Sequence, residues 1–269
     1  MDVTLTDSEF ALFQRLIHGL AGIHFTPAKK VLLVGRLARR LNHFGFNNYS
    51  AYYRLLASGT QPDEVQRFVD LLTTNETYFF REPQHFDFLR DEILAKRPTR
   101  TPFRIWSGAC SSGEEPYTMA MVLADTLPAH AAWEVFASDI SLTMLTRARA
   151  GLYPLERARD VPPELMRKYC LKGVRSQAGT LLVVPALRQR VTFAQVNLTT
   201  PIAGAGEFDV IFLRNVMIYF DAAIRRQVVD NLFPCLKPGG YFIIGHSESL
   251  NGVTDRLWPL RPTIYRKPD

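Results

Sequence analysis

The pattern of apolar and polar positions divides the chain into a helical first part and a second part in which strands and helices alternate. In residues 1–80, apolar side chains recur at the three- and four-residue spacing of amphipathic helices, and no run is typical of a strand. Thr6 and Glu9 stand three residues apart, as in a capping box. The helices expected here begin after Thr6 and run from Thr26-Pro27 to about His43, from Tyr49 to Ser58 and from Pro62 to about Leu72.

Strands and helices alternate in the rest of the chain, after a helix expected over Gln84–Lys96 that links the two parts. From Phe103 onward, short β-branched and aromatic runs are separated by helical patterns. This alternation predicts an α/β fold with a doubly wound, mostly parallel sheet. Strands are expected at 103–107, 133–138, 191–196, 208–213, 241–245 and 263–267, and helices at 115–127, 142–150, 163–170 and 222–236.

The segment Gly151–Arg190 forms an extra excursion between the second and third strands. It contains the turn-rich loop Gly173–Gly179, followed by the strand-forming run Thr180–Val184. We expect a small antiparallel β subdomain over about 171–190. Pro185 follows the run directly, which is typical of an edge strand, and an edge can accept a peptide strand through main-chain hydrogen bonds. The alternative is a hairpin that only covers the main sheet.

Composition bears on the compartment and on the classes of site that the chain can hold. Apolar residues make up 47% of the chain and charged residues 22%, which suits a packed globular core. No apolar run approaches the ~18 residues needed to span a membrane, and the polar start lacks the features of a signal peptide. The three cysteines form no Cys-x-x-Cys pair. We therefore expect a cytoplasmic protein without disulfides, and no metal site, since the histidines show no ligand spacing.

Positive charge is concentrated near the N-terminus. The chain carries a net charge of +6, but the stretch between Glu9 and Asp63 contains no acidic residue and sums to +7. At 100° per residue, Lys29, Arg36 and Arg40 fall on one helix face with Arg39 beside them. This face predicts a binding surface for an anionic partner, and the alternative is a solvated charged face.

A loop of small residues between the first strand and the next helix indicates a ligand site. Ile105–Tyr117 reads as a strand, a turn and a helix, the place where open α/β sheets bind nucleotide-like ligands. The loop has neither Gly-x-Gly-x-x-Gly nor Gly-Lys-Ser/Thr, which argues against dinucleotides and triphosphates. The acidic pair Glu114-Glu115 would repel phosphate and suits a ligand with hydroxyls and positive charge, such as S-adenosylmethionine. The alternative is a tight connection without a ligand.

Polar residues end the neighbouring strands. Asp139 ends the second strand, where a carboxylate can accept ribose hydroxyls or can cap the following helix. Asn197 follows the third strand and could bind an adenine edge or stabilise a turn. Leu213–Phe220 follows the fourth strand without the Pro-Pro of base-amino methyltransferases, which argues against methylation of a nucleobase. Thr73–Glu82 lies at the domain junction and combines polar and aromatic residues with Arg81, as a ligand site or a linker would.

Six motifs in chain order carry a resemblance to a known family. The segments Thr73–Glu82, Trp106–Tyr117, Ala137–Ile140, Arg214–Phe220, Leu236–Tyr241 and Gly245–Ser249 closely resemble the bacterial chemotaxis receptor methyltransferases, the CheR family. The resemblance covers nearly the whole chain. It implies a Rossmann-like class I methyltransferase sheet over 81–269 and a helical receptor-recognition domain over 1–80. The implied activity is that of a protein-glutamate O-methyltransferase, which converts S-adenosylmethionine to S-adenosylhomocysteine while forming glutamyl methyl esters on chemoreceptor helices.

The resemblance also assigns residues and partners. Arg81 and Tyr219 would lie nearest the transferred methyl group, and Lys29, Arg36, Arg39 and Arg40 would face the receptor. A receptor C-terminal tail is a further expected partner, at the β subdomain, whereas nucleic acid, membrane insertion and oligomerisation are not expected. Gly108 and Cys110 depart from relatives that carry alanines. Two other classes stay open, a nucleic-acid methyltransferase and a degenerate binding module. The cofactor site implied by the family consists of Asn75, Thr77, Arg81, Glu115, Asp139, Asn197, Leu198, Arg214 and Asn215.

Overall fold

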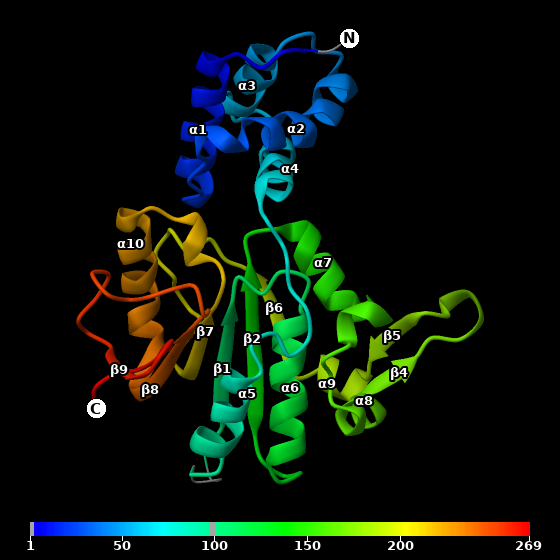
Figure 1. Cartoon of the computed structure of the whole chain (residues 1–269), viewed down its shortest axis with the longest axis vertical. Helices are drawn as coiled ribbons and strands as arrows, with labels where there is room; N and C mark the ends of the chain where they lie inside the picture. Colours follow the sequence, from blue (N-terminus) through cyan, green and yellow to red (C-terminus); the bar gives the residue numbers. More distant parts are fainter. Residues whose placement is uncertain (1–2, 97–100) are drawn as a thin grey trace.

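The computed structural model describes residues 3–96 and 101–269, and it shows a helical domain above an α/β domain (Figure 1). In the helical domain, Thr6 begins the first helix with the expected capping box, because its Oγ1 accepts from Glu9 N at 3.2 Å while Glu9 Oε2 accepts from Thr6 N at 3.0 Å. Apolar faces meet in a core that includes Phe13, Leu37 and Phe68. The helices are α1 (Asp7–Ala21), the 3-10 turn η1 (Pro27–Lys29), α2 (Lys30–Phe44), α3 (Tyr49–Ala57) and α4 (Pro62–Leu72).

The linking helix is shorter than expected. An α-helical turn, α5 (Gln84–Phe88), continues into a π-helical stretch, η2 (Leu89–Leu94). The helix was expected to reach Lys96, which lies in a turn in the structure. No helix of the described residues is both long and apolar enough to cross a membrane.

A seven-stranded sheet forms the centre of the second domain and confirms the expected α/β class. Its order is β6-β2-β1-β7-β8-β10-β9, and the first five strands in this order are parallel. The strands are β1 (Phe103–Gly108), β2 (Trp133–Asp139), β6 (Val191–Gln195), β7 (Phe208–Leu213), β8 (Leu236–Ile244), β9 (Trp258–Arg261) and β10 (Ile264–Arg266). The helices are α6 (Glu114–Thr126), α7 (Leu142–Ala150), α10 (Ala222–Leu232) and the 3-10 turns η5 (Met217–Tyr219) and η6 (Phe233–Cys235).

Two features of this sheet differ from the expectation. The edge strand β9 was not predicted, because all four of its residues are exposed and Pro259 interrupts the pattern. Strand β8 begins five residues earlier than the expected start at Tyr241, since Pro238-Gly239-Gly240 reads as a turn in the sequence. In the structure, these residues lie within a strand whose register to β7 shifts between Phe208 and Val210.

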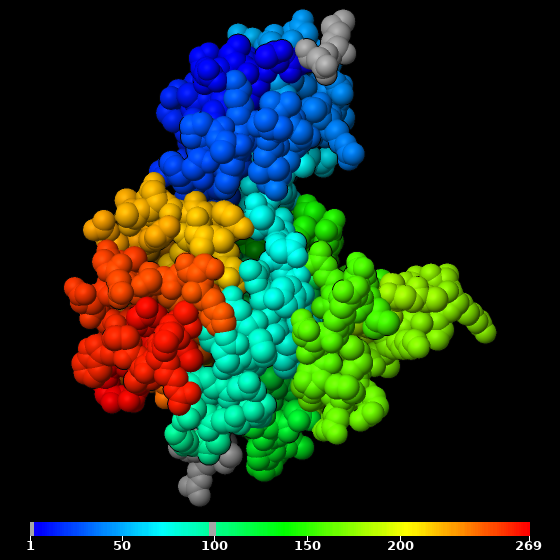
Figure 2. Space-filling model, in the orientation of Figure 1, coloured from blue at the N-terminus to red at the C-terminus, as the bar shows by residue number. Residues whose placement is uncertain are grey.

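The inserted β subdomain spans 152–183 and projects from the α/β domain (Figures 1 and 2). It is larger than the expected 171–190, because a strand before α8 also belongs to it. The expectation that Thr180–Val184 is an edge strand is wrong: β5 is central in the order β3-β5-β4, and Pro185 begins a short helix. The elements are β3 (Leu152–Pro154), η3 (Leu155–Ala158), α8 (Pro163–Tyr169), β4 (Cys170–Lys172), η4 (Arg175–Gln177) and β5 (Thr180–Val183), followed by α9 (Pro185–Arg188).

Hydrogen bonds fix the helical domain onto the α/β domain. His24 N donates to Tyr219 O at 2.8 Å, and Ile23 forms a β-bridge with Phe220. On the other side, the Asp70 carboxylate of α4 accepts from the main chain and hydroxyl of Thr143, at 3.1 and 2.6 Å, at the start of α7. The helical domain therefore covers the edge of the sheet at which the central strands have their carboxyl ends.

Candidate active site

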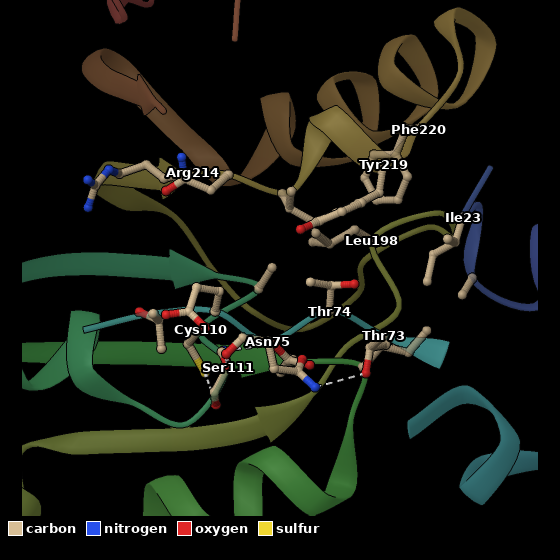
Figure 3. A pocket seen from close by; sticks show the side chains of 18 of the residues that line it. Ile23, Thr73, Thr74, Asn75, Cys110, Ser111, Leu198, Arg214, Tyr219 and Phe220 are labelled. Atoms are coloured by element: carbon tan, nitrogen blue, oxygen red, sulfur yellow. Dashed lines mark hydrogen bonds between the residues drawn. The ribbon is translucent and has the colours of Figure 1, made fainter. Parts of the chain in front are cut away.

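A pocket lies where the helical domain meets the carboxyl ends of β1, β2 and β7. Its walls come from the N-terminal domain, the junction segment 73–81, the loop after β1 and the loop after β7. Figure 3 shows Thr73, Asn75 and Ser111 on one side of this space and Tyr219 and Phe220 on the other, next to Ile23. All nine residues of the expected cofactor site line this pocket.

Strained backbone surrounds the pocket. Among the described residues, seven non-glycine positions have positive φ, and five of them lie in the loops that form this site. A left-handed conformation costs a residue with a Cβ on the order of 1 kcal/mol and persists only where the surroundings enforce it. The surrounding structure therefore holds these loops in strained conformations, as is common where a backbone contacts a ligand. The five are Phe80, Glu82, Ala109, Ser111 and Asn215.

A buried ion network forms the floor. Arg214, whose side chain is 1% exposed, donates to Glu115 Oε2 at 2.8 Å and to Glu82 Oε2 at 3.0 Å. Burial alone would raise the pKa of Glu82. The Arg214 charge and the hydrogen bonds from Asn215 and Arg214 together outweigh burial, so the pKa of Glu82 lies below its usual value. Two carboxylates and one guanidinium leave a net charge of −1 at this end of the pocket. The floor therefore favours a cationic group, such as an ammonium or a sulfonium, over a phosphate.

The acidic pair at the start of α6 divides between two roles. Glu115 faces the pocket, where its Oε1 accepts from the Ser107 hydroxyl at 2.6 Å. Glu114 is 1% exposed and turns away, toward Ser112 and Arg157. Burial raises the pKa of Glu114. Only one carboxylate of the pair is therefore available to a ligand.

Asp139 stands at the end of β2 and is 6% exposed. Its two carboxylate oxygens accept from Ser111 N and Ser141 N, each at 2.8 Å. Burial raises the pKa of Asp139. The helix cap that was the alternative role belongs to Ser141, whose hydroxyl accepts from Met144 N. Asp139 instead ties the loop after β1 to β2 and presents its edge to the pocket, where ribose hydroxyls are expected.

Asn197 and Leu198 line the wall beneath the helical domain. The Asn197 amide donates to Leu20 O at 2.8 Å and accepts from the Thr199 hydroxyl at 2.8 Å. The side-chain amide of Asn197 therefore stabilises a turn, which was the alternative role. Leu198 supplies an apolar surface to the same wall. At the junction, Asn75 donates to Thr73 Oγ1, whereas Thr77 is buried and its carbonyl accepts from Arg157.

Arg81, Tyr219 and Lys29 gather at the mouth. Arg81 Nη1 donates to Glu76 O at 2.8 Å, which restrains its guanidinium beside the Tyr78 ring. Among the described residues, the Tyr219 hydroxyl has no hydrogen-bond partner. Lys29 Nζ lies 5.3 Å from the Tyr219 ring centroid and pairs with no described carboxylate. The mouth therefore offers an uncommitted ammonium and an uncommitted hydroxyl.

The predicted cationic face of α2 is only partly exposed. Arg39 is exposed, and Arg36 donates to Thr73 O at 3.0 Å. Arg40 points inward: its Nε and Nη2 donate to the two Glu64 oxygens at 2.8 and 2.6 Å, and its side chain is 13% exposed. Glu64 lies just beyond the acid-free stretch. Arg40 is therefore neutralised inside the domain and does not belong to the surface on which it was expected.

Below the floor, Glu82, His85 and His246 come together, although the sequence shows no metal-ligand spacing. Their potential ligand atoms lie within 4.8 Å of one another. However, Glu82 Oε2 already accepts from Arg214 Nη2 at 3.0 Å and His246 N at 3.2 Å, and its Oε1 accepts from Asn215. His246 also contacts Gln84. We interpret the group as a hydrogen-bonded support for Arg214.

Glu248 was not singled out by the sequence reasoning, although it lies in the Gly245–Ser249 motif. Its carboxylate accepts from Gly245 N, Asn215 N and Met217 N at 2.7, 2.9 and 2.8 Å. These bonds hold the loop after β7 in its left-handed turn at Asn215. The available signal was an acidic residue three positions after the strand expected at 241–245.

Comparisons with known proteins agree with this geometry. Residues 75–265 match the family model described as CheR methyltransferase, SAM binding domain, and residues 8–73 match the CheR methyltransferase all-alpha domain. The chemotaxis protein methyltransferase of Escherichia coli is 39% identical over 98% of this chain and 92% of its own length. Chemotaxis protein methyltransferase 2 of Pseudomonas aeruginosa is 38% identical over 97% and 93%, and the Borreliella burgdorferi relative is 35% identical over 99% and 96%.

The match spans both domains and names the cofactor, S-adenosylmethionine, whose positive charge the floor of the pocket favours. The residues fit it: Glu115 belongs to the charged floor and lines the pocket, Asp139 ends β2, and Ala109 and Leu198 supply apolar walls. The chain belongs to the CheR family of S-adenosylmethionine-binding chemotaxis methyltransferases.

Proposed function

We propose that this protein methylates glutamate side chains on the cytoplasmic helices of chemoreceptors and forms glutamyl methyl esters. The observation that carries the proposal is the half-buried Lys29 ammonium, which lines the pocket beside Tyr219 without an acidic partner among the described residues. Partial burial of a cation without a counter-ion is unfavourable, and a substrate carboxylate would supply that counter-ion. The names of the relatives, chemotaxis protein methyltransferases, support the choice of a receptor substrate.

The chemistry needs no general base. A glutamate side chain has an unperturbed pKa of ~4.3, so it is already a nucleophilic carboxylate at neutral pH. S-adenosylmethionine supplies an electrophilic methyl group on a sulfonium when it is bound. Glu115 and Asp139 would hold the amino-acid and ribose ends, and the strained loops would fix the direction of the sulfonium–methyl bond. The protein thereby contributes alignment and exclusion of water, which both favour a reaction that merges opposite charges.

Arg81 and Tyr219 would act next to the reacting groups. The Tyr219 hydroxyl can donate one neutral hydrogen bond to the acceptor carboxylate without quenching its nucleophilicity. Arg81 is restrained by Glu76 O at 2.8 Å, so its remaining N–H groups are oriented before a ligand binds. A tight ion pair with the attacking oxygen would slow transfer, and we therefore assign Arg81 to the cofactor or to the non-attacking oxygen.

Lys29 would bind that non-attacking oxygen from the opposite domain. Burial, together with the nearby Arg36 charge, lowers the pKa of Lys29, so a carboxylate that relieves both effects binds favourably. The His24–Tyr219 hydrogen bond and the Ile23–Phe220 bridge fix its position relative to the methyl end. The helical domain would thus complete the acceptor site as well as recognise the receptor.

The receptor helix would lie along the exposed side of α2. Arg39 is exposed there, and Val31 and Leu32 are 82% and 39% exposed. A glutamate-rich helix would match both the charge and the apolar contacts. We also propose that a receptor tail docks on the β subdomain. It would pair with β4, which is an edge strand, and not with β5, which lies in the centre of the small sheet. Tethering there would raise the local substrate concentration without changing the chemistry.

Kinetics of methyl transfer test the acceptor site. Lys29→Gln is expected to reduce kcat/KM for a receptor cytoplasmic fragment by about tenfold or more, the scale of a hydrogen bond to a charged group. Its affinity for S-adenosylhomocysteine should be unchanged, and Lys29→Arg should restore part of the activity. Arg39→Gln is the matched control, because it removes one charge from the exposed surface and should cost about threefold or less. Equal losses in Lys29→Gln and Arg39→Gln would show that Lys29 contributes only to the general surface charge.

A nucleic-acid methyltransferase is the competing class, and the basic N-terminal stretch is what favours it. The pocket argues against it, because the loop after β7 lacks the Pro-Pro of base-amino enzymes. Labelled methyl transfer should therefore appear on receptor fragments and be absent from RNA and DNA under the same conditions. Transfer to nucleic acid alone would reverse the assignment.

A further inference from the structure

A second hollow lies on the outer side of the α/β domain, at the neck of the β subdomain. The chain enters the subdomain at Arg149–Gly151 and leaves it through α9. The hollow between these crossings has a volume of about 470 Å³, and its walls include Tyr117, Arg149, Arg188, Gln189 and Phe193. None of these residues contributes to the methyl-transfer pocket. Figure 2 shows the subdomain projecting from this neck.

Two guanidinium groups of this hollow lack acidic partners. Neither Arg149 nor Arg188 pairs with a carboxylate among the described residues. Arg188 Nη2 donates to Arg149 O, and Arg149 Nη2 donates to Phe193 O, both at 3.0 Å. Main-chain bonds therefore hold both groups in place at the hollow, and the Tyr117 hydroxyl is a further partner of Arg188. Arg188 Nε is buried and has no hydrogen-bond partner.

The surroundings reinforce this positive charge. Residues 147–190 contain ten lysines and arginines against three acidic residues, a net charge of +7 that equals the surplus of the N-terminal stretch. The Tyr117 hydroxyl donates to Ala148 O at 2.9 Å, and burial raises its pKa to about 12, so it does not provide an anion for Arg188. Gly151 leaves room for the Arg188 side chain, because a Cβ there would lie 3.1 Å from Arg188 Cδ and 3.2 Å from its Nε.

We propose that this hollow binds a phosphate-bearing small molecule. A phosphate group presents three oxygens, which can accept from both guanidiniums and from the Gln189 amide at once, whereas a carboxylate presents only two. Such a ligand would neutralise the two guanidinium charges that lack acidic partners. It would also tie Arg149 to Arg188 and so join the two chain crossings at the neck. The site is separate from the methyl-transfer pocket and does not depend on which substrate is methylated.

Calorimetry on the full chain tests the proposal, with S-adenosylhomocysteine saturating so that the cofactor pocket is filled. Inorganic phosphate and pyrophosphate are titrated separately, and succinate serves as the carboxylate probe. We expect saturable binding of pyrophosphate or phosphate that Arg188→Gln and Arg149→Gln each weaken by about tenfold or more. Arg159→Gln is the matched control, because this exposed arginine removes the same charge outside the hollow, and binding should change by less than about twofold.

Three results would overturn the site. One is the absence of saturable heat with either phosphate probe. Another is an equal loss in Arg159→Gln, which would mean that only the regional charge attracts anions. The third is succinate binding as tightly as pyrophosphate, which would refute the phosphate class. Melting curves of each variant establish folding, and either Arg149→Gln or Arg188→Gln suffices for the test if the other does not fold.

Discussion

Replacing Arg40 by glutamine separates a structural arginine from a receptor-binding one. The Arg40 guanidinium makes two hydrogen bonds to Glu64, at 2.8 and 2.6 Å, and the two side chains are 13% and 6% exposed. Arg40→Gln leaves the Glu64 carboxylate buried with the Tyr52 hydroxyl as its main remaining donor. Loss of one partner from a buried pair costs about 3–5 kcal/mol, and the slight exposure of Arg40 favours the lower value. At about 2–4 °C per kcal/mol, the melting temperature should fall by about 6–12 °C.

The pH dependence of this loss has a definite sign. Burial raises the pKa of Glu64, but the hydrogen bonds from Arg40 and Tyr52 lower it below its usual value. In the wild type, the pair stabilises the fold above the unfolded pKa of ~4.3 and loses its effect as the pH falls through the lowered folded value. In Arg40→Gln the unpaired carboxyl has a raised pKa. The difference in stability between the two proteins should therefore be large at pH 7 and shrink below about pH 5.

Thermal unfolding at pH 7 and pH 4.5 is the assay, with Arg39→Gln as the control. Arg39 is exposed on the same helix, so its replacement should change stability by less than about 0.5 kcal/mol. Equal melting temperatures for the two variants would refute the buried pair. A loss of receptor methylation in folded Arg40→Gln, without a loss of stability, would mean that Arg40 binds the receptor and does not stabilise the helical domain.

Four further outcomes follow from the site. Asp139→Ala should weaken S-adenosylmethionine binding by about 1.5–3 kcal/mol in calorimetry, and unchanged affinity in a folded variant would defeat its role at the ribose. Tyr219→Phe should lower turnover at saturating receptor with unchanged cofactor affinity, whereas wild-type turnover would remove it from the chemistry. Charge reversal at Arg36 and Arg39 should slow methylation most at low ionic strength, and insensitivity to salt would leave that face merely solvated. Receptor tail peptides should bind while S-adenosylhomocysteine fills the pocket, and competition between the two would disprove separate docking on the β subdomain.

The main sheet and the meeting of its strand-ending residues at one pocket could be predicted from the sequence because local patterns determine them. Each central strand is a short apolar run, and Asp139 and Asn197 follow directly after two such runs. Parallel strands place their carboxyl ends at one edge, so residues at those ends meet whatever the packing elsewhere. The strand-ending residues therefore reach the pocket as expected.

Contacts between distant segments could not be predicted in the same way. A helical projection places Arg40 beside Arg36 but does not show that this side packs against α4, where Glu64 lies 24 residues away. Likewise β5 reads as an edge strand, because its partner β3 has only three residues and shows no alternation. The floor joins Arg214 to Glu115 and Glu82, 99 and 132 residues apart in the chain, and no local pattern reports such a network.

The chemical identity of the product tests the central claim most directly. A receptor cytoplasmic fragment is incubated with this protein and S-adenosylmethionine carrying a labelled methyl group, and the product is then analysed by peptide mass spectrometry and by treatment with mild base. We expect the label on glutamate side chains, release of labelled methanol by base, and no transfer to a fragment whose modified glutamates are replaced by alanine. A base-stable label, or a label on any other residue type, would contradict glutamate O-methylation.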